Sequence, residues 1–388
     1  MKSVKQTSRS RLCLDYIQSL PFFKTILTIA ILIPLSLNVT QGKQFFQKIG
    51  KTDRYKQVVN NDQLIKSNNT QVLTIVTVEN STTLFNQDGF AYGFGYDLIR
   101  NFSDQMNLRL DVKTVANEAT ALKWVKQGKA QIALSTAPIN QVEDFGLIAV
   151  ESSCGIPNTL QKYGLDPNLS LVFQSAEKTL TASASGYLCQ AQQSGAIQQL
   201  ASFYDQNYLN DHDLDVVTRN LENRLPIYKA NFKQSAQAHD LDWQFLAAIG
   251  YQESYLNPNS ISPTGVRGVM MLTQNTARAM GVSDRTNPAQ SIQGGAKYID
   301  AMLEQYDDVP QPDRNWYALV AYNMGPGALN QIMAQLQRQG KNPNQWVNVY
   351  RYLQEHQHRN NRYSQALQYV KRIRVYLEHI KTSSLANV

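Results

Sequence analysis

The spacing of apolar residues divides the chain beyond its first 70 residues into two parts. In the first part, β-branched and apolar runs at 72–78 and 131–135 flank a stretch of helical spacing at 96–105, with a further strand and helix between them. This β-α-β-α-β order is typical of an α/β layer with parallel strands. We therefore predict an α/β domain over residues 71–210.

From about residue 221 the pattern changes to helical spacing throughout. Apolar stripes with a period near 3.6 recur between Pro and Gly breaks in these stretches: 221–238, 241–255, 273–280, 288–306, 315–322, 327–338 and 363–381. A chain of 388 residues is long enough for two such domains. We predict a mainly α-helical domain over residues 220–382, with the domain boundary near 210–225.

The first 70 residues have the pattern of an exported protein. A basic stretch precedes the uncharged run 25–39, whose apolar core of about 13 residues suits an export signal better than a full membrane span of ~20 residues. We predict that residues 1–40 are a signal peptide or an N-terminal membrane anchor. Residues 41–70 are polar and without periodicity, which indicates a tether.

Composition favours folded domains, because hydrophobic residues make up 43% of the chain and charged residues only 17%. The formal net charge of +7 is concentrated after residue 337, where nine Lys and Arg occur with two Glu. A basic tail suits nucleic acid, anionic lipid or an anionic polymer, and also a solvated helix face. We expect the last helix to direct these basic side chains outward toward anionic wall or lipid: Lys371, Arg372, Arg374 and Lys381.

Export changes the interpretation of the three cysteines, since thiols can pair in an oxidising compartment. Cys13 precedes the apolar run and is expected to stay apart. Cys154 and Cys189 lie in one region and are expected either to form a disulfide or to be two buried free thiols. Neither these cysteines nor the histidines have the spacing of a zinc site, so we expect no metal and no cofactor.

One acidic residue lies on an apolar helix face. Glu253 follows Phe245, Leu246 and Ile249 by eight, seven and four residues, so all four share one face of the predicted 241–255 helix. Burial disfavours the charged form of a carboxyl group and raises its pKa toward the range of a general acid. The alternative is an exposed Glu near a helix end, since Pro258 soon follows.

Two further segments support the indication from Glu253 that the helical part contains a functional site. Residues 262–273 form a glycine-hinged loop that leads into a new helix, and glycines allow the backbone to approach a ligand closely. Residues 321–327 place Tyr322 and Asn323 at a helix terminus. An aromatic face and an amide suit the apolar faces and hydroxyl edges of sugar rings, so the pair favours a carbohydrate cleft.

Together these segments resemble the lytic transglycosylase branch of the lysozyme-like superfamily. The resemblance covers about residues 220–380 and rests on Tyr-Gln-Glu-Ser at 251–254, Ser-Pro-Thr-Gly-Val-Arg-Gly at 262–268, Met-Met-Leu-Thr at 270–273, Asp-Arg-Thr at 284–286, Gln-Ser-Ile-Gln-Gly-Gly at 290–295, Ala-Tyr-Asn-Met-Gly at 321–325 and Tyr-Val at 369–370. It implies that Glu253 is the catalytic acid/base. It also implies that substrate is contacted by these residues: Ser262, Met270, Met271, Tyr322, Asn323 and Tyr369. Many relatives have Gln at the position of Met271, so the hydrogen bond of that Gln is absent here.

The reaction that this resemblance implies is cleavage of peptidoglycan glycan strands between MurNAc and GlcNAc, with formation of 1,6-anhydro-MurNAc ends. A hydrolytic lysozyme-type muramidase and a non-catalytic peptidoglycan-binding envelope protein are the alternatives. A hydrolase normally uses a second carboxylate, and none near Glu253 in sequence is convincing. The expected location is the periplasm, in peripheral association with the outer membrane, with peptidoglycan and not nucleic acid as partner.

The first part resembles periplasmic solute-binding domains over about residues 71–140. A weaker resemblance to the same domains is present over 171–210. The runs Leu-Thr-Ile-Val-Thr at 73–77 and Gly-Phe-Gly-Tyr-Asp-Leu at 93–98 carry this resemblance. Only about 30 residues separate the two halves, which is too short for a second α/β lobe. The cation that often binds a ligand carboxylate is also missing after residues 135–138. We predict a truncated, one-lobed domain that binds no free amino acid and serves as a spacer or docks envelope proteins.

Overall fold

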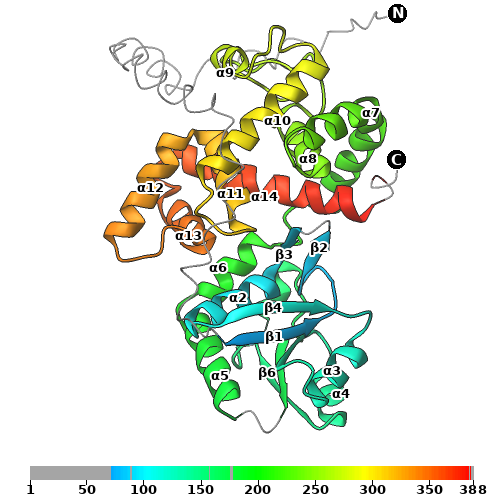
Figure 1. Ribbon diagram of the computed structural model, residues 1–388, viewed down its shortest axis with the longest axis vertical. Helices are drawn as coiled ribbons and strands as arrows, with labels where there is room; N and C mark the ends of the chain where they lie inside the picture. The colour runs from blue at the N-terminus through cyan, green and yellow to red at the C-terminus, as the bar shows by residue number, and fades with distance from the viewer. Residues whose placement is uncertain (1–70, 88–89, 157, 175–177, 384, 386–388) are drawn as a thin grey trace, which may run out of the picture. The chain divides into compact units, whose positions relative to one another are not determined.

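The computed structural model describes residues 71–385 except 88–89, 157, 175–177 and 384 (Figure 1). All of these residues belong to one compact unit, Asn68–Val388. The predicted export segment, the tether and Cys13 lie outside the described residues. No helix in the described ranges is both long and apolar enough to cross a membrane.

The predicted β-α-β-α-β unit is present near the start of the described chain. Its elements are β1 (Val72–Thr77), α2 (Phe94–Gln105), β4 (Arg109–Thr114), α3 (Glu118–Lys126) and β5 (Ile132–Ser135). β1 pairs in parallel with β4 on one side and with β5 on the other. Helical crossovers of this kind join parallel neighbours, so the expected parallel pairing of this unit is confirmed.

The rest of the sheet departs from the parallel pattern. The order is β4-β1-β5-β7-β6, and β7 (Ser170–Gln174) pairs antiparallel with both β5 and β6 (Leu147–Glu151). Between β6 and β7 the chain contains only a short connection with the turn η2 (Gln161–Tyr163). Without a helical crossover, the returning strand pairs antiparallel with its neighbour. The sheet is therefore mixed rather than wholly parallel.

Smaller elements complete this part of the chain: β2 (Phe85–Gln87), β3 (Phe90–Tyr92), α4 (Ile139–Asp144), α5 (Lys178–Gln193) and α6 (Ala196–Phe203). β2 and β3 form a separate antiparallel pair. A disulfide joins Cys154, in the connection after β6, to Cys189 on α5. The covalent link ties the short connection to the helix that follows β7.

The helical part contains α7 (Asp211–Gln237), α8 (Trp243–Ser254), α9 (Gln274–Ala279), α10 (Pro288–Gln305), α11 (Asp313–Met324), α12 (Pro326–Arg338), α13 (Trp346–His356) and α14 (Asn361–Thr382). Seven of these eight described helices coincide with predicted stretches. α7 begins ten residues earlier than expected, because Asn210 caps it through a side-chain bond from the Asp213 N–H. α13 was missed, although Trp346, Val349, Tyr350 and Leu353 have helical spacing.

The two parts share one buried core. Ile75 of β1 and Ile249 of α8 belong to the same cluster of buried apolar residues. At the junction, the ring of Phe203 at the end of α6 lies against Trp316 of α11 and Trp346 of α13, with ring centroids 5.4 Å apart in both pairs. Burial of large rings at such distances stabilises the junction strongly.

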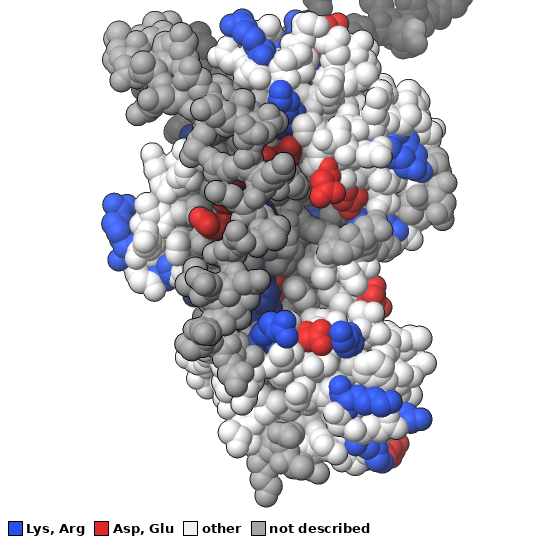
Figure 2. All heavy atoms as spheres, in the orientation of Figure 1, with Lys and Arg blue, Asp and Glu red and all other residues white. Residues whose placement is uncertain are grey.

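The expected outward basic face of the last helix is wrong for two of its four residues. Arg374 is 0% exposed and pairs with Glu378, and Lys381 is 3% exposed and pairs with Asp242 at 2.5 Å. The cause is the position of α14, which packs against α8, α11 and α13, so that side chains on several of its faces are buried. On the face drawn in Figure 2, Lys and Arg occur in separate groups rather than in one patch.

Candidate active site

α8 determines the position of Glu253. The Asp242 carboxylate caps its first turn by accepting hydrogen bonds from the backbone N–H groups of Gln244 and Phe245 at 2.8 and 3.4 Å. The helix ends at Tyr255, which has a left-handed φ of 53°. Glu253 therefore lies in the last turn. It is partly buried, and its predicted face companions Phe245, Leu246 and Ile249 are buried.

The Glu253 carboxyl group has one recorded hydrogen-bond partner among the described residues. The Tyr369 hydroxyl of α14 donates to Glu253 Oε1 at 2.5 Å. Burial raises the pKa of Glu253 to about 7, and the Tyr369 hydroxyl opposes this rise because it stabilises the carboxylate. A carboxyl group with such a pKa is present in both protonation states at neutral pH, so it can give up a proton and accept one.

Tyr322 of α11 forms a second wall of the site. Its hydroxyl donates to the Met270 carbonyl at 2.9 Å, and its ring lies nearly parallel to that of Tyr369, with centroids 6.5 Å apart. The ring of Tyr298 of α10 also packs against that of Tyr322, with centroids 5.0 Å apart. Burial and the charge of Glu253 raise the pKa of both Tyr322 and Tyr369, so both hydroxyls stay protonated as donors. Tyr298 was not predicted from the sequence, because there it is only one position in the apolar stripe of the predicted 288–306 helix.

The side chain of Met270 packs in the interior of the helical part. It is fully buried between Gly250 and Gly295, where an added Cβ would lie 3.1 Å from Met270 Sδ and 2.6 Å from Met270 Cγ, respectively. The Met270 N–H donates to Ser291 Oγ at 3.1 Å. Any contact between Met270 and a substrate would therefore have to involve its backbone. Met271 is partly exposed and has a left-handed φ of 46°.

The loop 261–272 is closely bound to α8 and to the segment before α10. The Ser254 hydroxyl, next to Glu253, donates to the Val269 carbonyl at 2.8 Å. Gly268 has a φ of 87°, and a Cβ at this position would lie 1.8 Å from the Arg285 carbonyl oxygen. Only glycine fits both constraints. Ser262 Oγ accepts from the Val266 N–H at 3.0 Å, so this hydroxyl also shapes the loop.

The structure thus brings together Glu253, Tyr369 and Tyr322, with the Met270 backbone beside them. Asn323 is exposed at the end of α11. No recorded bond or ring contact within the described residues joins Asn323, Ser262 or Met271 to this group, and their substrate contacts stay predictions. Across the same residues, no cluster of three or more His, Cys, Asp or Glu could hold a metal ion.

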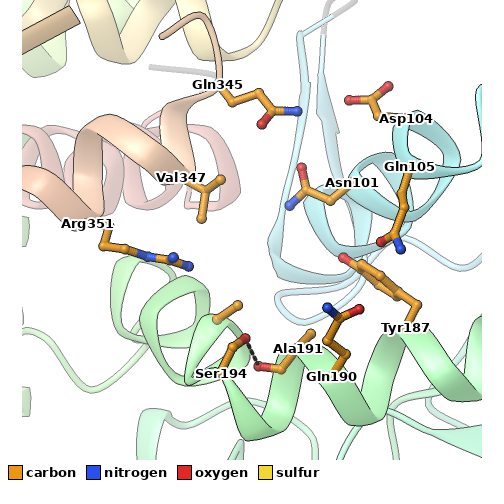
Figure 3. A pocket seen from close by; sticks show the side chains of 11 residues that line it. Asn101, Asp104, Gln105, Tyr187, Gln190, Ala191, Ser194, Gln345, Val347 and Arg351 are labelled. Atoms are coloured by element: carbon orange, nitrogen blue, oxygen red, sulfur yellow. Dashed lines mark hydrogen bonds between the residues drawn. The ribbon is translucent and has the colours of Figure 1, made fainter. Parts of the chain in front are cut away.

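A separate polar groove of about 470 Å³ lies away from these residues. Figure 3 shows the amide side chains of Asn101, Gln105, Gln190 and Gln345 directed into it from both parts of the chain, together with Arg351. The Arg351 guanidinium already donates to the Gln199 side chain. The groove shares no residue with the Glu253 group.

Comparison with known proteins agrees with this geometry. Residues 230–345 match the family model described as the Transglycosylase SLT domain. The chain is similar to membrane-bound lytic murein transglycosylase F. The helical part therefore carries a lysozyme-like SLT domain, and the matched residues include Glu253 and Tyr322.

Three relatives illustrate the similarity to membrane-bound lytic murein transglycosylase F. The Pseudomonas putida protein is 43% identical over 204 residues, covering 50% of this chain and 42% of the relative. The Stutzerimonas stutzeri protein is 37% identical over 248 residues, covering 62% and 49%. The Alcanivorax borkumensis protein is 45% identical over 188 residues, covering 47% and 40%. The chain thus spans less than half the length of these relatives.

A solved 70 kDa soluble lytic transglycosylase from Escherichia coli is 21% identical over 53% of this chain and 33% of its own, with a TM-score of 0.33. No structural conclusion rests on a match of this size.

Proposed function

We propose that this protein is a peptidoglycan lytic transglycosylase that cleaves the bond between MurNAc and GlcNAc and leaves 1,6-anhydro-MurNAc ends. The observation that carries the proposal is Glu253, a partly buried carboxyl with a pKa of about 7 and a hydrogen bond from Tyr369. The similarity to membrane-bound lytic murein transglycosylase F supports the same reaction.

The proposed mechanism uses Glu253 twice. First, its protonated carboxyl gives a proton to the glycosidic oxygen, and the bond from that oxygen to C1 of MurNAc breaks. The resulting carboxylate then takes the proton from the C6 hydroxyl of the same MurNAc, whose oxygen bonds to C1 and closes the anhydro ring. The proton balance is zero, and no water is consumed. A pKa near neutrality suits both steps.

The tyrosines would assist in two ways. The Tyr369 hydroxyl stabilises the carboxylate formed in the first step, because it donates to the oxygen that becomes charged. The Tyr322 ring lies beside it and would support an apolar sugar face. Ser262 and Met271 in the loop 261–272, and Asn323 in the last turn of α11, would contact the strand.

A hydrolytic muramidase is the nearest alternative on the same fold. Such an enzyme normally pairs its acid with a second carboxylate at about 5 to 9.5 Å. Among the described residues, burial and the Tyr369 hydroxyl account for the shifted pKa of Glu253, with no carboxylate contributing. A non-catalytic binding protein has no need of a carboxyl group held near neutrality, so we favour the lyase.

Mass spectrometry of fragments released from purified peptidoglycan tests the proposal. A lytic transglycosylase gives anhydro ends, which are 18 mass units lighter than the reducing ends of a muramidase, roughly the mass of the water that is not added. Reducing ends alone would establish hydrolysis. No fragments at all, from a protein that still binds the strands, would support the non-catalytic alternative.

For location, we propose the cell envelope, on the periplasmic side and in peripheral association with the outer membrane. The printed names of the relatives and the basic, then apolar, N-terminal sequence support this placement. Fractionation of cells, with detection of the full chain in soluble and membrane fractions, tests it. Recovery in the soluble fraction alone would contradict membrane association.

For the α/β part, we propose a one-lobed solute-binding-like domain that binds no free amino acid. The residues between β6 and β7 are too few for a second lobe. At the end of β5, the Glu118 carboxylate accepts hydrogen bonds from Ser135 Oγ at 2.6 Å and from the Thr136 N–H at 3.1 Å. These donors are thus already occupied by an internal carboxylate. Calorimetric titration of the full chain with amino acids should show no saturable heat, and saturable binding would refute the proposal.

A further inference from the structure

A hollow of about 560 Å³ adjoins the loop 261–272. Its lining includes Arg267 from this loop, Gln274 from α9, and Asp284 and Arg285 from the segment before α10. A volume of this size suits a small ligand or one branch of a larger one. Because two arginines line this hollow, it is a candidate site for an anionic ligand.

The charge of these two arginines is not neutralised within the described residues. Arg285 Nη1 donates to the Leu272 carbonyl at 2.9 Å, which leaves its other donors available, and Arg267 is exposed. None of the recorded ion pairs includes either residue. The nearby Asp284 carboxylate instead accepts from the N–H and hydroxyl of Thr286 at 2.9 and 2.6 Å. The hollow therefore carries an excess of positive charge.

A short backbone path connects the hollow to Glu253, the proposed catalytic residue. Val269, whose carbonyl is bonded to Ser254 beside Glu253, follows Arg267 by two residues, or about 7 Å of extended chain. On the other side, the Arg285 backbone is in contact with Gly268. The loop that borders the Glu253 group therefore also holds both arginines in place.

This placement matches the chemistry of a stem-bearing glycan strand. In peptidoglycan, each peptide stem is attached to MurNAc and carries free carboxylates. Arginine binds carboxylates through paired, charge-assisted hydrogen bonds. We propose that Arg267 and Arg285 form a subsite for the carboxylates of the peptide stem on the strand being cleaved. This inference rests on the proposed function and makes the two arginines specificity-determining residues.

The test compares two substrates that differ only in the stem. Glycan strands are used intact or after an amidase has removed their peptides, and kcat/KM is measured for each. We expect Arg267→Gln to lower the ratio of intact over stem-free kcat/KM about tenfold, which is the order expected for one lost charge-assisted pair. The loss should appear in KM and should shrink as salt rises.

Matched variants control for folding. Arg285→Lys keeps the charge and one donor to the loop, so it should lower the ratio less than Arg267→Gln does. Arg351→Gln removes an arginine from the separate polar groove and should leave the ratio unchanged. Equal losses of kcat/KM on both substrates for Arg267→Gln, or no loss on either, would overturn the subsite.

A binding measurement separates this inference from the proposed function. Calorimetry in the Glu253→Gln background compares intact strands, stem-free strands and the free peptide, without need of turnover. Weaker binding of intact strands after Arg267→Gln supports the subsite even if the wild-type chain cleaves nothing. Tight binding of the free peptide, in competition with intact strands, would also support a subsite for the stem. Unchanged binding of intact strands after Arg267→Gln would refute the subsite.

Discussion

Among the described residues, burial affects both Glu253 and the pair of Asp97 and Asp313, and different partners give these carboxyl groups different roles. Glu253 has a tyrosine hydroxyl as its partner, and its pKa rises to about 7. Asp97 and Asp313 share the guanidinium of Arg100, at 3.0 and 2.6 Å, where α2 meets α11. Burial raises the pKa of both aspartates as well, while Arg100 lowers it.

The comparison shows how a fold separates a reactive carboxyl from a structural one. A cation next to a buried carboxylate offsets part of the cost of burial and joins elements, as Arg100 joins α2 to α11. The Tyr204 hydroxyl and the backbone N–H of Trp346 complete that cluster by donating to Asp97 and Asp313, respectively, at 2.7 Å each. Glu253 has no such cation among its recorded partners and keeps a proton to transfer at neutral pH.

Glu253→Gln should have the largest effect on activity. It keeps the shape of the side chain and removes the transferable proton, so kcat should fall at least about 100-fold. Release of anhydro fragments from peptidoglycan measures the loss, with circular dichroism as the control for folding. Cleavage at near the wild-type rate would remove Glu253 from the mechanism.

The same variant should be more stable than the wild type in alkaline solution. The pKa of Glu253 rises from 4.5 to about 7 on folding, so its contribution to stability is present below pH 4.5 and is lost as pH rises through 7. Glutamine does not titrate, so the variant does not lose this contribution. The free energy of unfolding of the variant minus that of the wild type should be roughly 1 to 3 kcal/mol larger at pH 8 than at pH 5. Urea denaturation at the two pH values gives the difference, and equal pH dependence of both proteins would contradict the shifted pKa.

Arg100→Met tests the structural group. It leaves Asp97 and Asp313 buried without their cation, and we expect a loss of about 3 to 5 kcal/mol in the free energy of unfolding near neutral pH. The loss should be smaller at pH 5, because both carboxyls can then be protonated. Denaturation curves at pH 5 and 8 measure it. A loss of the same size at both pH values would show that packing, not charge, explains the effect.

Tyr369→Phe should have an intermediate effect on catalysis. Removing the hydroxyl removes the bond that lowers the pKa of Glu253, so that pKa should rise above about 7. We expect kcat to fall about tenfold, with the pH optimum shifted upward. The pH profile of kcat/KM distinguishes this from a packing defect, which would lower the rate without moving the profile.

Lys113→Ala should have the smallest effect. Lys113 pairs with Asp111 at 3.1 Å, but both side chains are well exposed, at 49% and 39%. A solvent-exposed pair contributes little, and we expect a change within about 0.5 kcal/mol. A thermal or urea denaturation curve is sufficient to check it. A loss approaching that of Arg100→Met would mean that burial does not explain the contrast between the two pairs.

Some of this structure follows from local sequence alone. The positions of Phe245, Leu246, Ile249 and Glu253 on one helix face depend only on helical geometry, and the structure has α8 where the spacing predicts it. The strands β1, β4 and β5 are parallel for a similar reason, since helical stretches separate them. The raised pKa of Glu253 was also predictable, because a carboxyl group on an apolar stripe is a local pattern.

The partners of these groups were decided only by the tertiary structure. Tyr369 is 116 residues from Glu253, and Asp313 is 213 residues from Arg100, so no local pattern relates them. The burial of Arg374 and Lys381 was missed for the same reason, because each meets a distant acceptor: Arg374 donates to the Asp205 carbonyl, and Lys381 pairs with Asp242. Helix periodicity specifies which face of an element is apolar, whereas the packing of distant elements decides which polar groups meet on it and therefore which protons can move.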